Sequence, residues 1–200
     1  MRAHEKISGM TVSPPIPREA AARGRWPLVA LFVLFFGSML GAGVLRFSGW
    51  QPPARRNHGE LLTPPADLRV LQPLLADGSG YAWRPQQRLW RIALAPPAEC
   101  ASACDALARE LDKVWQLFGH DADRVQILWI GTPSPWIRTL PQVRVLRADP
   151  ALLAALPRVH DAAGVPVYVI DPNGFVVLRY APGFDPAGLH ADLAKLLKLL

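Results

Sequence analysis

RLWRIALAPPAECASAC, residues 88–104, is the stretch that decides the fold of this 200-residue chain. Its first eight residues have the apolar pattern of a β-strand. Apolar residues then recur at helical spacing over residues 102–119, and Gly119 ends that helix. Cys100 and Cys104, the only cysteines in the sequence, therefore stand where a strand passes into a helix.

The elements expected after the cysteines continue the alternation of strand and helix. Residues 171–174, Asp-Pro-Asn-Gly, have the composition of a hairpin turn. Strands are expected at residues 124–131, 143–147, 165–170 and 175–180, and helices at residues 149–156 and 185–200. The order is β-α-β, a short βα piece, then β-β-α, which predicts an α/β fold of the thioredoxin-like arrangement.

One apolar stretch upstream, residues 27–45, has 19 residues without a charge. As a helix it would be roughly 28 Å long, close to the hydrocarbon thickness of a bilayer. We expect a membrane-spanning helix over residues 27–47 that stays in the protein; a cleaved signal peptide is the alternative.

Lys and Arg are concentrated near this stretch. The first 50 residues hold six Lys and Arg against two Asp and Glu, and the other 150 hold 16 against 14. The positive-inside rule then predicts a single-pass protein of the inner membrane, with a cytoplasmic N-terminus and a periplasmic C-terminal domain. The soluble part has no basic stripe interleaved with aromatic residues, so we expect no nucleic-acid partner.

These patterns divide the chain into four parts. Residues 1–26 are expected to be a disordered basic tail on the cytoplasmic side. The spanning helix follows, and residues 48–87, rich in proline, are expected to form an extended linker with some packing around Leu68, Val70 and Leu71. Residues 88–200 then form the thioredoxin-like domain.

The cysteine pair permits more than one chemistry. At a helix N-terminus the backbone N–H groups favour the thiolate, and two nearby thiolates suit Cu(I). The pair can also exchange disulfides with a partner. A purely structural disulfide closing so short a loop would constrain little of the unfolded chain. Absence of any role remains the fourth reading.

Two features downstream are candidates to complete the site. His160 is the histidine that precedes the Gly164-Val165-Pro166 segment, which lies beside the cysteine turn in a thioredoxin-like fold. His160 is therefore the candidate third copper ligand, although a lone loop histidine is often just a surface residue. Pro166 is either a cis proline packed against the cysteines or a proline that simply begins a strand.

The chain resembles Sco-type copper-insertion proteins. The resemblance rests on the N-terminal anchor, Cys100-x-x-x-Cys104 after a strand, and the segment Val-Tyr-Val-Ile-Asp-Pro-Asn-Gly at residues 167–174. The segment Asn-His-Gly-Glu-Leu-Leu at residues 57–62 adds to this resemblance. With it, the chain looks like the small Sco-like membrane proteins found beside cytochrome c oxidase genes in proteobacteria. The similarity covers roughly residues 27–200.

The resemblance implies a thioredoxin-like protein that delivers copper to cytochrome c oxidase or reduces its copper site. Sco proteins usually have a proline after each motif cysteine, where this chain has Ala101 and Asp105. Alignment of the hairpins places their copper-binding histidine near Ala163, three positions past His160.

Three functions follow as hypotheses. The first is a membrane-anchored, periplasm-facing protein that assists cytochrome c oxidase assembly and binds Cu(I) through Cys100 and Cys104, with an oxidase subunit or another copper or thiol protein as partner. The second is a thiol-disulfide oxidoreductase, in which Cys100 attacks and Cys104 resolves. The third is a non-catalytic docking protein.

Overall fold

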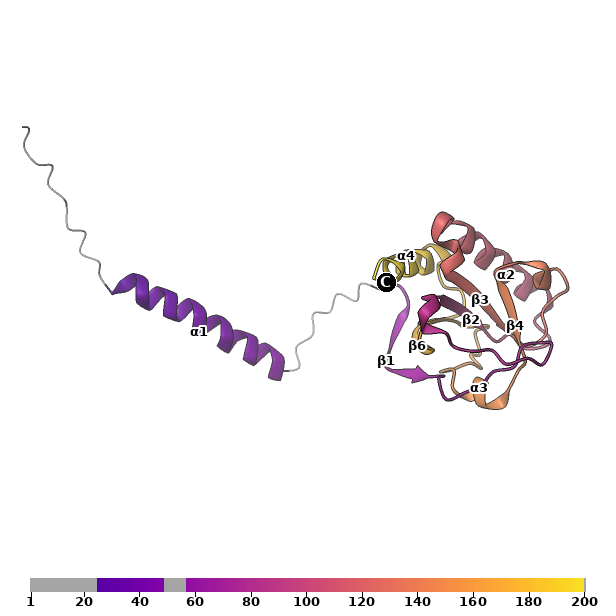
Figure 1. Ribbon diagram of the computed structural model, residues 1–200, viewed down its shortest axis with the longest axis horizontal. Helices are drawn as coiled ribbons and strands as arrows, with labels where there is room; N and C mark the ends of the chain where they lie inside the picture. Colours follow the sequence, from indigo (N-terminus) through magenta and orange to yellow (C-terminus); the bar gives the residue numbers. More distant parts are fainter. Residues whose placement is uncertain (1–24, 49–56, 200) are drawn as a thin grey trace, which may run out of the picture. The chain divides into compact units, whose positions relative to one another are not determined.

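The computed structural model describes residues 25–48 and 57–199. The chain divides into two units, residues 1–53 and residues 54–200, and each is described by itself (Figure 1). The tail expected at residues 1–26 lies almost wholly outside the described residues, as does the first part of the expected linker.

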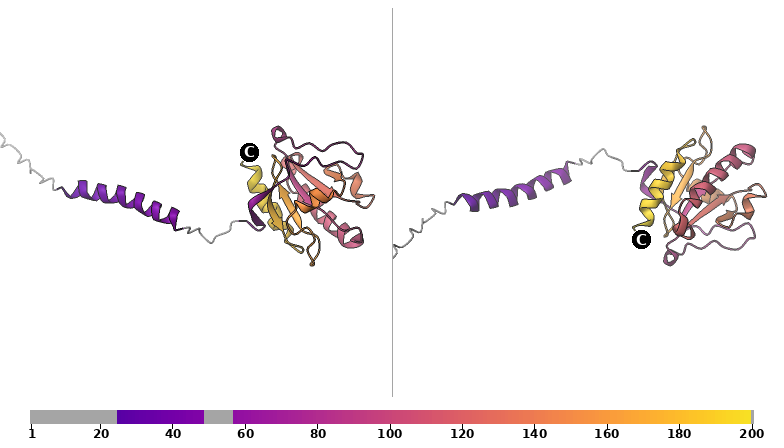
Figure 2. Two further views of the ribbon diagram at one scale, coloured as in Figure 1. Left: turned by 90° about the horizontal axis from the view of Figure 1, so that it is seen from below. Right: turned by 90° about the horizontal axis from the view of Figure 1, so that it is seen from above.

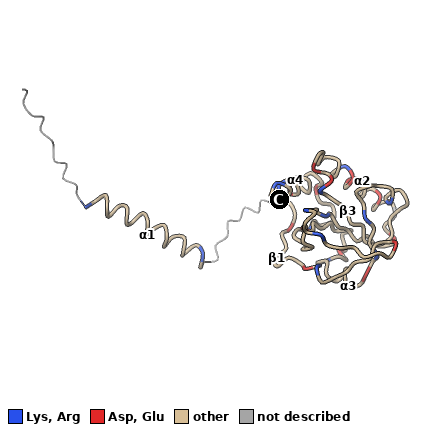
Figure 3. Tube along the Cα trace, in the orientation of Figure 1, with Lys and Arg blue, Asp and Glu red and all other residues tan. Residues whose placement is uncertain are grey.

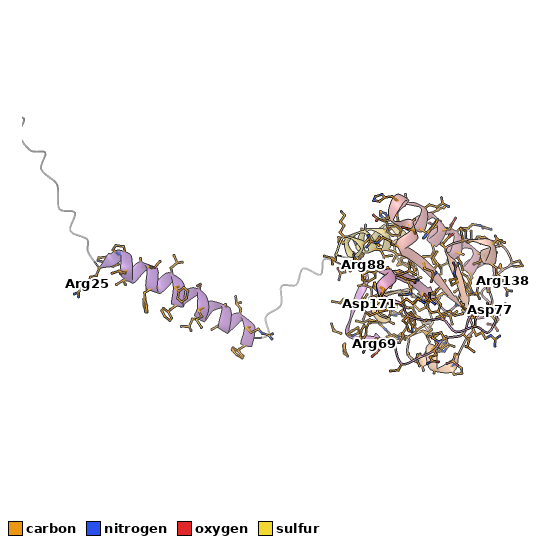
Figure 4. The ribbon with its side chains drawn as sticks, viewed as in Figure 1. Arg25, Arg69, Asp77, Arg88, Arg138 and Asp171 are labelled. Atoms are coloured by element: carbon orange, nitrogen blue, oxygen red, sulfur yellow. A yellow bond between two sulfur atoms is a disulfide. The ribbon has the colours of Figure 1, made fainter. Side chains whose placement is uncertain are left out.

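The described residues of the first unit form one helix, α1 (Trp26–Phe47), with Pro27 in its first turn and Arg25 at its start (Figure 4). Its 22 residues span roughly 33 Å and none of them is buried by protein. Charges stand only at its two ends (Figure 3). The predicted apolar helix is confirmed, and it is long and apolar enough to cross a membrane.

The second unit is built on one six-stranded mixed sheet with strand order β1-β6-β5-β2-β3-β4. Strands β2, β3 and β4 run parallel, whereas β5, β6 and β1 join them through antiparallel pairs. The strands are β1 (Glu60–Asp67), β2 (Trp90–Leu94), β3 (Val125–Ile130), β4 (Val143–Leu146), β5 (Val167–Ile170) and β6 (Phe175–Tyr180).

Helices cover both faces of this sheet. Helices α2 (Ala101–Gln116) and α4 (Pro186–Leu197) lie side by side on one face, as Figure 2 shows. The short helix α3 (Pro150–Ala154) packs on the other, together with the segment after β1. Asp149 caps α3 by accepting hydrogen bonds from the backbone N–H groups of Ala151 and Leu152. The thioredoxin-like order of elements is confirmed.

Alternate residues of the central strands build two separate cores. Ile92 and Leu94 of β2 face α2 and α4, while Ala93 faces α3. All five residues of β2 are buried, as expected of a strand in the middle of a sheet that is covered on both faces. The strand that leads to the cysteines is thus enclosed on both faces of the sheet.

Strand β1 departs from the sequence prediction. Residues 60–67 were expected to belong to an extended linker, but they pair with β6 at the edge of the sheet. Pro64 and Pro65 conceal the strand pattern, and an edge strand with a register shift between Leu61 and Ala66 tolerates them. Of the three residues expected to pack just beyond β1, Leu68 is fully buried and Leu71 packs against the same core, but Val70 is exposed, so that part of the expectation is wrong.

Asp192 of α4 holds the residues that precede β1; we call these contacts the Asp192 clamp. The buried carboxylate of Asp192 accepts hydrogen bonds from the backbone N–H groups of His58 (2.6 Å) and Gly59 (3.1 Å) and from the Tyr180 hydroxyl (2.9 Å). A Cβ atom at Gly59 would lie 2.6 Å from the Tyr180 ring, so only glycine fits there. His58, expected in the linker, is therefore held against the domain.

Candidate functional site

Cys100 and Cys104 are joined by a disulfide at the start of α2, with their Cα atoms 5.4 Å apart. Cys100 is the residue that caps the helix, and the N–H of Cys104 makes the first helical hydrogen bond to the Cys100 carbonyl (2.8 Å). One turn of helix therefore places both sulfur atoms on the same side. The expected convergence of the two cysteines is found.

The two cysteines differ in exposure. Cys104 is 5% exposed and belongs to the core between the sheet and α2. Cys100 is half-buried at the surface. A partner thiol or metal ion therefore reaches Cys100 first, and Cys104 lies behind it.

Cys100 lines a cavity of about 690 Å³ at the carboxyl end of β2. The walls are mostly apolar, and two segments that are distant in sequence both line it. One is the Pro-Pro-Ala-Glu-Cys run at residues 96–100, and the other is the loop of residues 159–165. The sequence expectation that the Gly164-Val165 segment lies beside the cysteine turn is borne out.

His160 lines the same cavity as Cys100, but it is exposed. Among residues 25–48 and 57–199, no three His, Cys, Asp or Glu side chains form a group placed to hold a metal ion. The structure, which has the cysteines in the disulfide form, thus places His160 at the cysteine cavity. In this form His160 and the two sulfur atoms do not make up one set of metal ligands.

Asp161, next to His160, is the polar residue of this loop with the most contacts. Its carboxylate accepts a hydrogen bond from the backbone N–H of Ala163 (3.0 Å) and pairs with the guanidinium of Arg179, which is 2% exposed. The Ala163 N–H and the Arg179 side chain hold the pKa of Asp161 below its ordinary value. The pairing of Asp161 with Arg179 could not be predicted from the sequence, because the two residues are 18 positions apart and Arg179 lies in an ordinary strand pattern.

Pro166 is buried, and the bond from Val165 is trans: the cis peptide among the described residues is Thr63–Pro64. The cis alternative for Pro166 is therefore wrong. Pro166 simply precedes β5, where a missing backbone donor costs nothing.

Asp105 occupies the position after the second cysteine. Its carboxylate accepts a hydrogen bond from the Ser134 hydroxyl (2.7 Å), which ties the first turn of α2 to the loop after β3. A proline would make no such bond. This departure from the Sco pattern thus has a structural use in this chain.

Once reduced, the site would offer two thiols in adjacent positions at a helix N-terminus, one accessible and one buried. That arrangement can carry out disulfide exchange, because the exposed sulfur attacks or is attacked and the buried sulfur resolves the mixed disulfide. It also offers two soft donors at one point, which fits a Cu(I) ion.

Comparison with known proteins supports the fold. The family model for the "transmembrane-like, thioredoxin-like, C-terminal domain" matches residues 90–200. No protein of curated function matches the sequence. Among solved structures, the chain is similar to BsSco, described as a member of the Sco family of cytochrome c oxidase assembly proteins with a disulfide switch. That match has 11% identity and a TM-score of 0.50, and it covers 71% of this chain and 98% of BsSco.

Two further structures have lower TM-scores. ScoI of Bradyrhizobium japonicum with copper bound is 19% identical, with a TM-score of 0.45 over 68% of this chain and 98% of its own. Peroxiredoxin Q of Xanthomonas campestris is 17% identical, with a TM-score of 0.42 over 70% of this chain and 96% of its own. The match to BsSco confirms the resemblance to Sco proteins at the level of the fold.

Proposed function

This chain belongs to the family of transmembrane-like, thioredoxin-like C-terminal domains, and from that premise we propose that it is a membrane-anchored thiol protein that carries Cu(I) for cytochrome c oxidase assembly. The observation that carries the proposal is the Cys100–Cys104 pair at the start of α2, open to a cavity through Cys100 alone. The Sco proteins with this fold are described as oxidase assembly proteins, and ScoI is described with copper bound.

Copper is the cargo in this proposal, and the donor set suits it. Cu(I) is a soft ion that accepts few ligands, and two thiolates can satisfy it. Cys100 and Cys104 supply both from one helical turn. His160 is proposed as the third ligand, because its loop lines the same cavity as Cys100.

The disulfide must be reduced before the ion binds. A dithiol partner attacks Cys100, the mixed disulfide forms and is resolved by the partner's second thiol, and the two electrons and two protons pass to Cys100 and Cys104. Loss of the two thiol protons then accompanies binding of Cu(I). Transfer to the oxidase subunit proceeds by exchange of these thiolates for ligands of the partner.

The proposed location is the inner membrane, with α1 crossing once, the N-terminus in the cytoplasm and the domain in the periplasm. Its support is the excess of Lys and Arg before α1 and the nearly balanced charge after it. A disulfide is also the form expected of a cysteine pair in an oxidising compartment.

The test is an anaerobic Cu(I) competition titration of the full reduced chain in detergent micelles. We expect one equivalent to be retained against a moderate Cu(I) chelator and to be lost in Cys100→Ser and in Cys104→Ser. Asp105→Asn, which keeps an acceptor for Ser134 beside Cys104, is the matched control and should retain the ion. Failure of the wild-type chain to hold Cu(I) would overturn the proposal.

The second candidate is a thiol-disulfide oxidoreductase that keeps a partner's cysteines reduced. The unequal exposure of the two cysteines favours it, because an accessible attacking thiol and a buried resolving thiol are what such a reaction needs. It predicts that Cys104→Ser traps a mixed disulfide through Cys100. If neither single serine variant traps a partner, this second function is excluded.

A further inference from the structure

One row of polar side chains crosses three neighbouring strands beneath the His160 loop. Glu60 of β1 stands directly opposite Arg179 of β6, and Arg179 stands opposite Tyr168 of β5. Direct cross-strand partners project from the same face of a sheet, so the three side chains lie side by side on the face that α3 covers.

Each member of this row contacts the loop of residues 157–161. Glu60 pairs with Arg158, Arg179 pairs with Asp161, and the Tyr168 hydroxyl donates to the Pro157 carbonyl (2.8 Å). Burial raises the pKa of Tyr168, so the hydroxyl keeps the proton that it donates.

The row is also connected within itself. Arg179, 2% exposed, lies between two carboxylates, because its second guanidinium nitrogen is 3.8 Å from Glu60. A buried guanidinium needs charged partners, and here one of them belongs to the loop and the other to β1. The loop therefore cannot leave the sheet without exposing or unpairing Arg179.

The contacts flank His160 on both sides. Pro157 and Arg158 precede it, Asp161 follows it, and Asp161 closes a tight turn by accepting from Ala163 and by a backbone contact with Gly164. The His160 ring itself makes no hydrogen bond or ion pair within residues 57–199. The imidazole is thus unengaged, while the backbone that carries it is fixed at three points.

We propose that Glu60, Arg179 and Tyr168 are positioning residues that hold the His160 loop in place as part of the lining of the Cys100 cavity, so that His160 is presented to an ion held by the cysteines. This inference rests on the proposed function, since it concerns the same site. It adds that the third ligand is prepared by the sheet, and by β1 in particular.

The loop itself is tested first, without copper. Amide hydrogen exchange is measured in the full oxidised chain for Tyr168→Phe and Glu60→Gln, which remove one contact each while keeping side-chain size. We expect exchange at residues 159–164 to be about tenfold faster in Tyr168→Phe, the effect of one lost hydrogen bond on local opening. In Glu60→Gln we expect it to be about threefold faster, because the ion pair between Glu60 and Arg158 is exposed. Glu110→Gln, which breaks an exposed ion pair with Lys113 on α2, should leave this loop unchanged.

The effect on the site is tested by Cu(I) affinity in two backgrounds. With His160 present, we expect Tyr168→Phe to weaken Cu(I) binding about tenfold, the usual scale for residues that orient a ligand. In His160→Ala, Tyr168→Phe should have no further effect. A merely structural role would instead weaken both backgrounds equally, and that result would overturn the proposal.

The two proposals fail in different ways. If the wild-type chain holds no Cu(I), the proposed function fails, and the exchange measurement alone decides the positioning role. Unchanged exchange at residues 159–164 in both Tyr168→Phe and Glu60→Gln overturns the positioning role even where Cu(I) is bound.

Discussion

The two walls of the cavity are built in opposite ways. The wall with Cys100 is local: a strand, a short turn and the first turn of α2, closed by a disulfide between residues four apart. The wall with His160 is a loop held by side chains from three strands, one of which starts 100 residues before it. The first wall is fixed by short-range geometry and the second by long-range polar contacts.

The difference predicts which wall depends on the rest of the fold. A disulfide across one helical turn survives local changes elsewhere. A loop held through the buried Arg179 depends on β1, β5 and β6 all being in place. The changes below test this contrast, from the largest expected effect to the smallest.

Arg179→Ala should have the largest effect. It removes the buried guanidinium that bridges Asp161 and Glu60, at a cost of about 3 kcal/mol in the free energy of unfolding. Urea unfolding followed by circular dichroism measures it. Arg158→Ala, at an exposed pair with the same Glu60, is the control and should cost less than about 1 kcal/mol. Equal losses in the two variants would show that burial of Arg179 does not matter.

Reduction of the disulfide should have a smaller effect. Opening a five-residue loop removes a restraint on the unfolded chain worth roughly 2 kcal/mol at most. The folded domain should persist with a modestly lower urea midpoint, and the Cys100→Ser/Cys104→Ser variant should not respond to reductant. Unfolding of the domain on reduction would mean that the wall with Cys100 also supports the wall with His160.

The smallest expected effect on the free energy of unfolding is that of acid on the Asp192 clamp, which holds the start of β1 against α4. Burial alone would raise the pKa of Asp192, but hydrogen bonds from Gly59, His58 and Tyr180 hold it below its ordinary value. A lowered pKa means that the carboxylate stabilises the fold above about pH 4 and loses this contribution as the pH falls through the lowered value. The stability gap between the wild type and Asp192→Asn should therefore narrow in acid. A gap that does not change with pH would contradict the assignment.

The local elements were predictable from the sequence. Residues 88–104 give a strand, a turn and a helix start, and the Asp-Pro-Asn-Gly turn gives the hairpin of β5 and β6. The placement of both cysteines at the start of α2, and of the segment around Gly164 beside them, follows from the order of these strands and helices. These elements are predictable because the apolar residues of each one recur at a regular spacing within a single short segment.

The long-range contacts were not predictable in the same way. Strand β1 contains Pro64 and Pro65, which read as linker, and only pairing with β6 makes the stretch a strand. Glu60, Tyr168 and Arg179 have no shared spacing in sequence, since they meet only through the registers of three strands. The burial of Arg179 would have indicated that it pairs with carboxylates and so holds the loop. A single sequence does not show that a charged residue is buried, so these contacts could not be predicted.

X-ray absorption at the copper edge of the Cu(I)-loaded, reduced full chain tests the central claim most directly. We predict two sulfur neighbours per copper in the wild type, and the loss of a nitrogen neighbour, with both sulfurs kept, in His160→Ala. Copper with fewer than two sulfur neighbours in the wild-type chain would contradict the assignment of Cys100 and Cys104 as one donor pair.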